Sequence, residues 1–261
     1  MISSLQNPSI KNIAKLAKSR ERRAQNLFVI EGARELSLAL QSRYEITQVY
    51  VCRELFSKTD YPDVLTGFEA DRITEISPVV FEKIAYREDS DGIIALATPR
   101  RHSLAELQLS NNPFVIILES VEKPGNLGAV LRTADAAAVD AVIVCDPQTE
   151  LYNPNVIRSS VGALFTVQTA VCSSQEALQW LHVHGITSYA AELQASDFYQ
   201  DVDFRSPSAI IMGTEADGLT DFWLKNASAR MKIPMRGKID SLNVSVSAAV
   251  LTFEAMRQRG F

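Results

Sequence analysis

The chain has 261 residues, of which 46% are hydrophobic, 22% charged and 8% aromatic, and its formal net charge at pH 7 is −5. This is the composition of a globular protein with one large domain or two smaller ones. The acidic balance disfavours a non-specific nucleic-acid binder, which is usually basic. The apolar runs are too short to span a membrane and the first residues lack the apolar core of a signal peptide, so we expect a cytoplasmic protein.

The cysteines and histidines indicate no metal site. Cys52, Cys145 and Cys172 are scattered, fit no zinc or disulfide spacing, and are expected to be reduced thiols packed as small hydrophobic side chains. His182 and His184 lie two residues apart, on different sides of a predicted helix, so we do not expect them to bind a metal together. The candidate loops described below contain no histidine, which disfavours Ser-His-Asp chemistry.

Positive charge is concentrated at the N-terminus. Residues 1–23 contain six basic side chains and one acid, Glu21, a local balance of 6 − 1 = +5. On this evidence alone, both a solvated helix face and a contact to an anion such as phosphate remain open. The basic residues are Lys11, Lys15, Lys18, Arg20, Arg22 and Arg23.

The first half of the chain alternates between helical and extended patterns, which predicts a small α/β domain. A polar segment at 99–112 follows, and we place a domain boundary there, near residue 105, giving domains 1–105 and 106–261. We expect two helices between Asn7 and Leu40, a helix over Pro78–Ala85, and strands over Ile46–Val51, Arg72–Ile76 and Gly92–Ala97.

The second half is more regular and predicts a mostly parallel sheet with helices on both faces. In such folds, ligands bind at the carboxyl ends of the strands. Strands are expected over Phe114–Leu118, Ala141–Val144, Phe165–Ala170, Ser188–Glu192, Ser208–Met212 and Arg230–Ile233. Helices are expected over Leu127–Ala138, Val156–Ala163, Gln175–His184, Thr220–Asn226 and Val246–Arg257.

Three loops at these strand ends are rich in glycine and polar side chains. The first, Lys123–Arg132, is neither a Walker loop nor a GxGxxG turn, and its Asn126 could cap the following helix. In the second, Met212–Leu219, Glu215 could hold a cation, cap a helix or orient an arginine. The third, Ile233–Val250, carries more polar side chains before its helix than one cap requires, which indicates a ligand site.

In these loops the sequence resembles the SpoU (TrmH) family of RNA ribose methyltransferases, which belong to the SPOUT superfamily. The family motifs are roughly N-x-G-x-x-x-R, G-x-E-x-x-G-L and I-P-M-x-G-x-x-x-S-L-N-V-S. They stand here, in the same order, as Asn126 to Arg132, Gly213 to Leu219 and Ile233 to Ser245. The segment Arg158–Phe165 is also similar to the family.

The first domain resembles, more weakly, the ribosomal-protein-like substrate-binding domain that is often fused in front, through Phe28–Gly32 and Gly92–Ala95. Two positions depart from the family pattern. Ala138-Val139-Asp140 stands where a glycine usually follows the first helix, and Lys123 stands before Pro124 where an acidic residue is common. Both concern the fine shape of the site.

The resemblance implies a trefoil-knotted SPOUT domain that transfers a methyl group from S-adenosylmethionine to a ribose 2′-hydroxyl, with the site formed at a homodimer interface. It implies cofactor contacts from Gly213, Ile233 and Leu242, with Met235 and Met212 nearby. Arg132 matches the family's catalytic arginine, and we favour a phosphate clamp and alkoxide stabiliser over a base, because a guanidinium stays protonated. The residues that would orient Arg132, the hydroxyl and the cofactor are Asn126, Glu215, Ser241 and Asn243.

If the first domain presents RNA, its six basic residues become phosphate contacts. The fused domain favours large-subunit ribosomal RNA as the substrate, with transfer RNA as the runner-up. A non-catalytic RNA-binding or ribosome-assembly protein with the same fold is a different reading, and the presence of all five polar site residues argues against it. A nucleotide-binding dehydrogenase is disfavoured by the lack of GxGxxG and of a histidine base.

Overall fold

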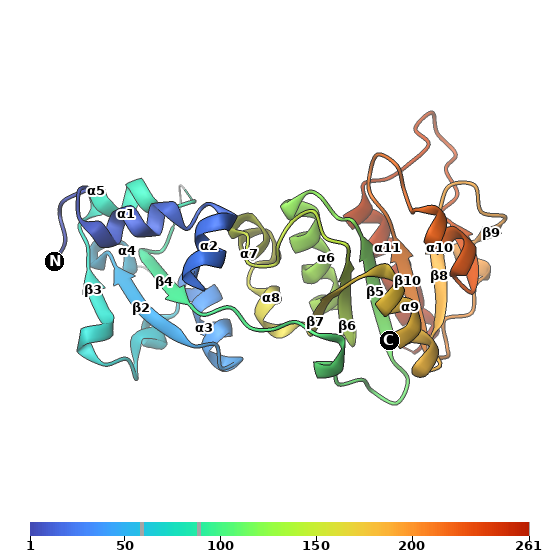
Figure 1. The fold of residues 1–261 in the computed structure, drawn as a ribbon, viewed down its shortest axis with the longest axis horizontal. Helices are drawn as coiled ribbons and strands as arrows, with labels where there is room; N and C mark the ends of the chain where they lie inside the picture. Colours follow the sequence, from blue (N-terminus) through green and yellow to red (C-terminus); the bar gives the residue numbers. More distant parts are fainter. Residues whose placement is uncertain (58–59, 88–89, 261) are drawn as a thin grey trace. The chain divides into compact units, whose positions relative to one another are not determined.

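The computed structural model describes residues 1–57, 60–87 and 90–260 (Figure 1). The chain forms two compact units. The first contains Met1–Arg101 and Glu150–Thr166, and the second contains His102–Thr149 and the chain from Val167 onwards. A single division into 1–105 and 106–261 leaves out the return of Glu150–Thr166 to the first unit, because hydrophobic periodicity does not tell which core a helix packs on.

The first unit is built on a four-stranded mixed sheet with the order β1-β4-β2-β3. Helices α1 and α5 pack together, and their apolar faces join one buried cluster with residues of β1, β2 and β4. Helix α1 begins where the sequence predicts, because the Asn7 side chain accepts a hydrogen bond from the Ser9 N–H at 2.9 Å. The strands are β1 (Phe28–Glu31), β2 (Ile46–Val51), β3 (Ile73–Glu75) and β4 (Ile93–Ala97). The helices are α1 (Pro8–Lys15), α2 (Ser19–Gln25), α3 (Ala33–Gln41), α4 (Arg53–Phe56) and α5 (Pro78–Ile84).

The segment that returns to the first unit corrects two predictions. The expected helix Val156–Ala163 is two helices, α7 (Pro154–Ser160) and α8 (Ala163–Thr166), because Val161 and Gly162 adopt left-handed backbone angles between them. The expected strand Phe165–Ala170 is wrong up to residue 168. Phe165 lies in α8 and packs its ring 5.0 Å from that of Tyr44, and the strand starts only at Thr169.

The second unit is built on a seven-stranded sheet with the order β7-β6-β5-β10-β8-β11-β9, in which every neighbouring pair is parallel. The predicted parallel α/β architecture is confirmed. The strands are β5 (Phe114–Glu119), β6 (Ala141–Cys145), β7 (Thr169–Cys172), β8 (Thr187–Ala191), β9 (Asp197–Phe198), β10 (Ser208–Met212) and β11 (Ala229–Lys232). The helices are α6 (Pro124–Ala136), α9 (Ser174–Val183), α10 (Asp221–Asn226) and α11 (Val244–Gln258).

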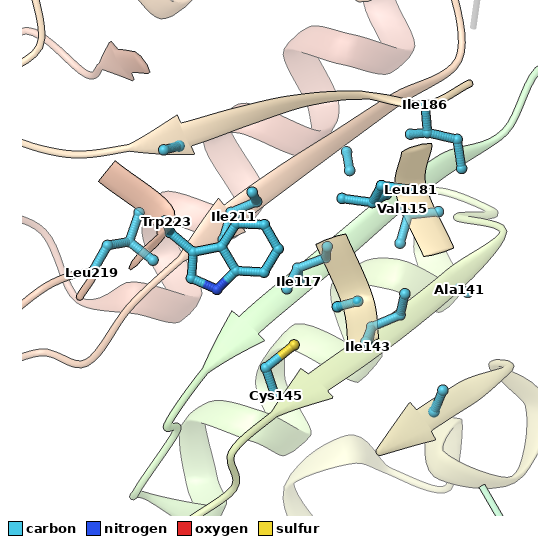
Figure 2. Packing of buried hydrophobic residues seen from close by; sticks show 14 residues of the cluster. Val115, Ile117, Ala141, Ile143, Cys145, Leu181, Ile186, Ile211, Leu219 and Trp223 are labelled. Carbon is cyan, nitrogen blue, oxygen red and sulfur yellow. The ribbon is translucent and has the colours of Figure 1, made fainter. Parts of the chain in front are cut away.

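Alternate strand residues face two helical layers. On one face, α9 and α10 cover a cluster that includes Val115, Ile117, Ile143 and Ile211, and Figure 2 shows Trp223 of α10 packed over it. The Trp223 side chain is fully buried, and its indole N–H donates to the Ser174 hydroxyl at 3.1 Å, so its polar atom is satisfied. Helices α6 and α11 pack against each other and contact β6 and β10.

No helix in the described ranges is long and apolar enough to cross a membrane.

The end of α6 carries backbone strain, within the segment 138–140 where the sequence resemblance leads us to expect a glycine. Ala138 follows the C-cap and has φ +49°, a left-handed conformation that L side chains adopt at a cost of about 1 kcal/mol. The N–H of Val139 donates to the Ala134 carbonyl at 2.9 Å, so the turn itself is well formed.

Ala138→Gly should therefore raise the free energy of unfolding by about 1 kcal/mol and the melting temperature by about 2–4 °C, because glycine relieves the strain. Thermal and urea denaturation measure both. Ala129→Gly, inside α6, is the matched control and should lower stability by about the same amount. Equal destabilisation by both changes would contradict the strain argument.

Candidate active site

The register of the sheet brings the three candidate loops to one edge. Leu118, the last but one residue of β5, pairs with Met212 at the end of β10, and β10 pairs in turn with β8. On the far side of β8, Ala191 pairs with Met231 of β11. The segments that follow β5, β10 and β11 therefore leave the sheet at the same carboxyl edge.

The carboxylate of Glu215 is the meeting point of the three loops. It forms an ion pair with Lys123, accepts a hydrogen bond from the side-chain amide of Asn126, and accepts another from that of Asn243 at 2.7 Å. The Asn243 amide also donates to the Asn126 side-chain oxygen at 3.2 Å. Lys123 above all, then both amides, hold the pKa of Glu215 below its ordinary value.

Helix geometry explains how the two amides reach this carboxylate. The prediction that Asn126 caps the helix after the first loop is wrong. That helix, α6, begins at Pro124 with Lys123 as its cap residue, and Asn126 lies inside its first turn. Its side chain is thereby released for Glu215. Asn243 does cap α11, since its oxygen accepts from the N–H of Ser245 at 3.0 Å, and its NH₂ group remains for Glu215.

The loop that carries Glu215 folds back on itself and is fixed at both ends. The N–H of Thr214 donates to the carbonyl of Gly218 at 3.0 Å, and a Cβ at Gly213 would lie 1.9 Å from the same carbonyl oxygen. Only glycine fits there. At the far end, the buried carboxylate of Glu119 accepts from the N–H of Thr220 at 2.8 Å and from its hydroxyl at 2.7 Å.

A cavity of about 540 Å³ lies between these loops, within the size range of small-molecule sites. All five predicted cofactor residues line it: Met212, Gly213, Ile233, Met235 and Leu242. Of the predicted catalytic residues, Glu215 and Ser241 line it as well. Apolar walls and exposed backbone of this kind can bury an adenine ring and hydrogen-bond its edge.

Arg132 is the predicted catalytic residue that the structure does not bring to this cluster. Its side chain is exposed and makes no hydrogen bond or ion pair within the described part of the chain. Six residues along α6 turn the helix by about 600°, so Arg132 points about 120° away from Asn126 around the axis. The guanidinium is available to something outside this subunit's own cluster.

The predicted RNA-contact residues divide into exposed and buried members. The side chain of Arg22 is 5% exposed, forms an ion pair with Glu150, and donates to the carbonyls of Leu16 and Ala17 at 2.7 and 2.8 Å. It is engaged in holding the first unit together, and we leave it out of the RNA-contact set. The other five are exposed: Lys11, Lys15, Lys18, Arg20 and Arg23.

Sequence reasoning missed several charged residues of the site, among them Lys123 and Glu192. Lys123 stands in the sequence only as a departure from the family pattern, and nothing there shows that its partner is Glu215. Glu192, in the cavity wall, directly follows strand β8, so the rule that ligands bind at the carboxyl ends of parallel strands could have found it. Within residues 1–57, 60–87 and 90–260 there is no group of three or more His, Cys, Asp and Glu side chains that could hold a metal ion.

Both units of the chain match known protein families. The model of the SpoU rRNA Methylase family matches residues 113–253, and that of the MRM3-like substrate binding domain matches residues 7–95. Together the matches span the sheet edge, the three loops and the basic N-terminal helices.

Several known proteins are similar to this chain over nearly its whole length and nearly the whole of their own. The 23S rRNA (guanosine(2553)-2′-O)-methyltransferase RlmP of Bacillus subtilis is 30% identical over 253 residues, covering 97% of each chain. A crystal structure of an RNA 2′-O ribose methyltransferase is 40% identical with a TM-score of 0.87, covering 100% of this chain and 99% of that one. An AdoMet-bound rRNA methyltransferase from Sinorhizobium meliloti is 26% identical with a TM-score of 0.87, covering 98% and 97%.

The Glu215 cluster predicts a pH dependence. A lowered pKa means that ionised Glu215 stabilises the fold above its ordinary value of 4.5, and that this contribution is lost as the pH falls through the lowered pKa. Lys123→Met should move the pKa of Glu215 back upward, because the ammonium group is the largest cause of the shift. A ¹³C NMR titration of the Glu215 carboxyl, assigned with Glu215→Gln, measures it.

Lys225→Met is the matched control, since Lys225 pairs with Asp221 on α10 and should leave Glu215 unchanged. A Glu215 pKa that stays equally low without Lys123 would assign the shift to the two amides instead.

Proposed function

Because the chain belongs to the SpoU rRNA methylase family, we propose that it is an enzyme that transfers a methyl group from S-adenosylmethionine to a ribose 2′-hydroxyl of RNA. One observation carries the proposal. Asn126, Glu215 and Asn243, from three separate segments, are hydrogen-bonded together at the sheet edge where the 540 Å³ cavity opens. Two of the relatives named above, RlmP and the RNA 2′-O ribose methyltransferase, carry 2′-O-methyl transfer in their names.

The cavity fits the proposed cofactor. Ile233, Met235 and Leu242 supply apolar wall for the adenine, and Gly213 leaves its backbone within reach of the ring edge. When bound, S-adenosylmethionine supplies a methyl group activated by its sulfonium. We place the cofactor residues in a trefoil knot formed by the last three loops, as in the SPOUT superfamily. The reaction as proposed uses no metal ion.

The site residues act by orientation and electrostatics rather than as a strong base. Glu215 is a poor proton acceptor, because three donors occupy its oxygens and its pKa is lowered. Arg132 stays protonated and can clamp a phosphate while stabilising negative charge that develops on the attacking oxygen. Ser241 lines the cavity, and Asn243 is held beside it by its hydrogen bond to Glu215, so that both would align the hydroxyl. Alignment of this kind can remove several kcal/mol from the barrier.

We further propose that the active species is a homodimer in which Arg132 serves the partner's site. Arg132 is exposed on α6 and directed away from its own cluster, so it is free to serve the site of a second subunit. Helix α11, which packs on α6, exposes Val246 and Phe253 seven residues apart on one face. Exposed apolar side chains on the helix that packs on α6 fit a subunit interface.

For the substrate we propose large-subunit ribosomal RNA in the cytoplasm. The first unit supports this, because the substrate-binding model matches it and its five exposed basic residues suit contacts to phosphates. A structured RNA element recognised by its shape fits such contacts better than a duplex groove. Transfer RNA and a purely RNA-binding role are the alternative outcomes of the test.

Ribose-methylation mapping of total RNA from cells with and without the gene tests this function. One 2′-O-methyl group in large-subunit ribosomal RNA should disappear in the deletion strain and return with the wild-type gene. A lost transfer-RNA signal would correct the substrate. If no methylation signal is lost and calorimetry shows no heat of S-adenosylmethionine binding, the enzyme proposal is wrong. The protein would then be an RNA-binding protein without catalytic activity.

Arg132→Ala should abolish methyl transfer and leave cofactor affinity nearly unchanged, because Arg132 does not line the cavity. Single-turnover assays and calorimetry measure the two effects. Glu215→Ala should also be inactive, through loss of the cluster. Mixing the two inactive homodimers should restore activity, since one composite site per heterodimer is intact. Failure of the mixture, with subunit exchange verified, would place Arg132 in its own subunit's site.

The basic residues of the first unit should govern the salt dependence of RNA binding. Each lost phosphate contact should reduce the slope of log K against log salt by about 0.7–0.9. Lys11→Gln with Lys15→Gln should therefore reduce it by about 1.4–1.8, measured by filter binding. Lys225→Gln, an exposed lysine of the second unit, should not change it. Arg22→Gln should lower the melting temperature instead, because Arg22 is buried.

A further inference from the structure

The wall of the cavity contains an acidic side chain, Glu192, to which the proposed reaction gives no role. It follows strand β8, which lies between β10 and β11 in the sheet. The N–H of Glu192 donates to the carbonyl of Met231 at 3.0 Å, so its backbone position is set by the sheet. Glu192 therefore lies between Gly213 and Ile233, the two residues proposed to contact the adenosine.

The carboxylate of Glu192 is only partly used by the protein. Its side chain is 13% exposed, and one oxygen accepts from Arg230 at 3.3 Å, a long contact to a side chain that is 53% exposed. Pairs with such an exposed partner contribute little to stability. The second oxygen has no hydrogen-bond donor within the described residues, and it is not a buried unpaired atom. One acceptor is therefore accessible at the cavity wall.

An accessible acceptor beside an adenosine site suits a sugar hydroxyl. An acidic residue near a strand end that accepts from a ribose hydroxyl is a general solution in nucleotide sites of parallel α/β folds. We propose that Glu192 accepts a hydrogen bond from a ribose hydroxyl of S-adenosylmethionine and so selects the ribose form of the cofactor. The proposal rests on the proposed function, because it requires that this cavity be the cofactor site.

Binding of S-adenosylhomocysteine tests the hydrogen bond separately from attraction to the sulfonium, since this product is uncharged at sulfur. Its 2′-deoxy and 3′-deoxy analogues each lack one hydroxyl. With the wild-type protein, calorimetry should show a loss of affinity of about tenfold or more for one analogue, as expected for a hydrogen bond to a charged group. The Glu192→Ala variant should bind S-adenosylhomocysteine as weakly as the wild type binds that analogue. It should bind the analogue and S-adenosylhomocysteine with equal affinity.

Two controls make the result specific. Glu254→Ala removes a carboxylate that is equally shielded, at 12% exposed, and paired with an arginine, but that does not line the cavity. Arg230→Ala removes the partner and leaves the Glu192 carboxylate in place. Both variants should keep the wild-type preference for the hydroxyl, and melting temperatures verify that all variants fold.

The outcomes separate the two proposals. If Glu192→Ala still discriminates against the same analogue as strongly as the wild type, the ribose contact is overturned while the cofactor site stands. Equal weakening for the parent compound and both analogues would also overturn it, because the residue would then act only on the shape of the cavity. Failure of the wild-type protein to bind either S-adenosylmethionine or S-adenosylhomocysteine would instead overturn the proposed function.

Discussion

The geometry of the candidate site depends on one carboxylate that receives donors from two other loops. Glu215 is bound by Lys123 and Asn126 from the segment after β5 and by Asn243 at the start of α11. In sequence, Lys123 lies 92 residues from Glu215, Asn126 lies 89 residues from it, and Asn243 lies 28 residues from it. Parallel strand register brings them close, and the shared acceptor, with one hydrogen bond between the two amides, fixes their side chains relative to each other. Removing it would leave two amides and an ammonium group without a common partner.

The same cluster limits the chemistry that the site can perform. A carboxylate saturated with donors stays ionised at neutral pH and accepts protons poorly, and a guanidinium cannot release one. A site with these groups gains rate mainly from alignment and from charge stabilisation, which require rigid positions. The two ends of the Glu215 loop supply such rigidity. At one end the Gly218 carbonyl packs directly against Gly213, and at the other Thr220 donates a hydrogen bond to the buried Glu119.

Sequence reasoning located the loops better than the contacts made within them. Strands β5 and β10 were predictable because runs of Val and Ile bounded by polar loops have few alternatives. Parallel topology predicted that the three loops meet, whereas the choice of Asn126, Glu215 and Asn243 within them came from the family resemblance. Phe165 was misassigned because an apolar residue near a strand can also belong to a short helix, and only tertiary packing decides. The burial of Arg22 was hidden for a similar reason, since its partner Glu150 lies 128 residues away.

The charge of the cavity wall links the proposed cofactor to turnover. Besides the Glu215 carboxylate, Glu192, Asp217 and Asp240 line the cavity, against one lysine, Lys232. S-adenosylmethionine carries a positive sulfonium that methyl transfer removes. An acidic wall therefore attracts S-adenosylmethionine more than the product S-adenosylhomocysteine. This difference in attraction is largest for carboxylates within a few ångströms of the sulfur. The same carboxylates that would favour loading of the cofactor would thus weaken retention of the spent product, without any movement of the protein.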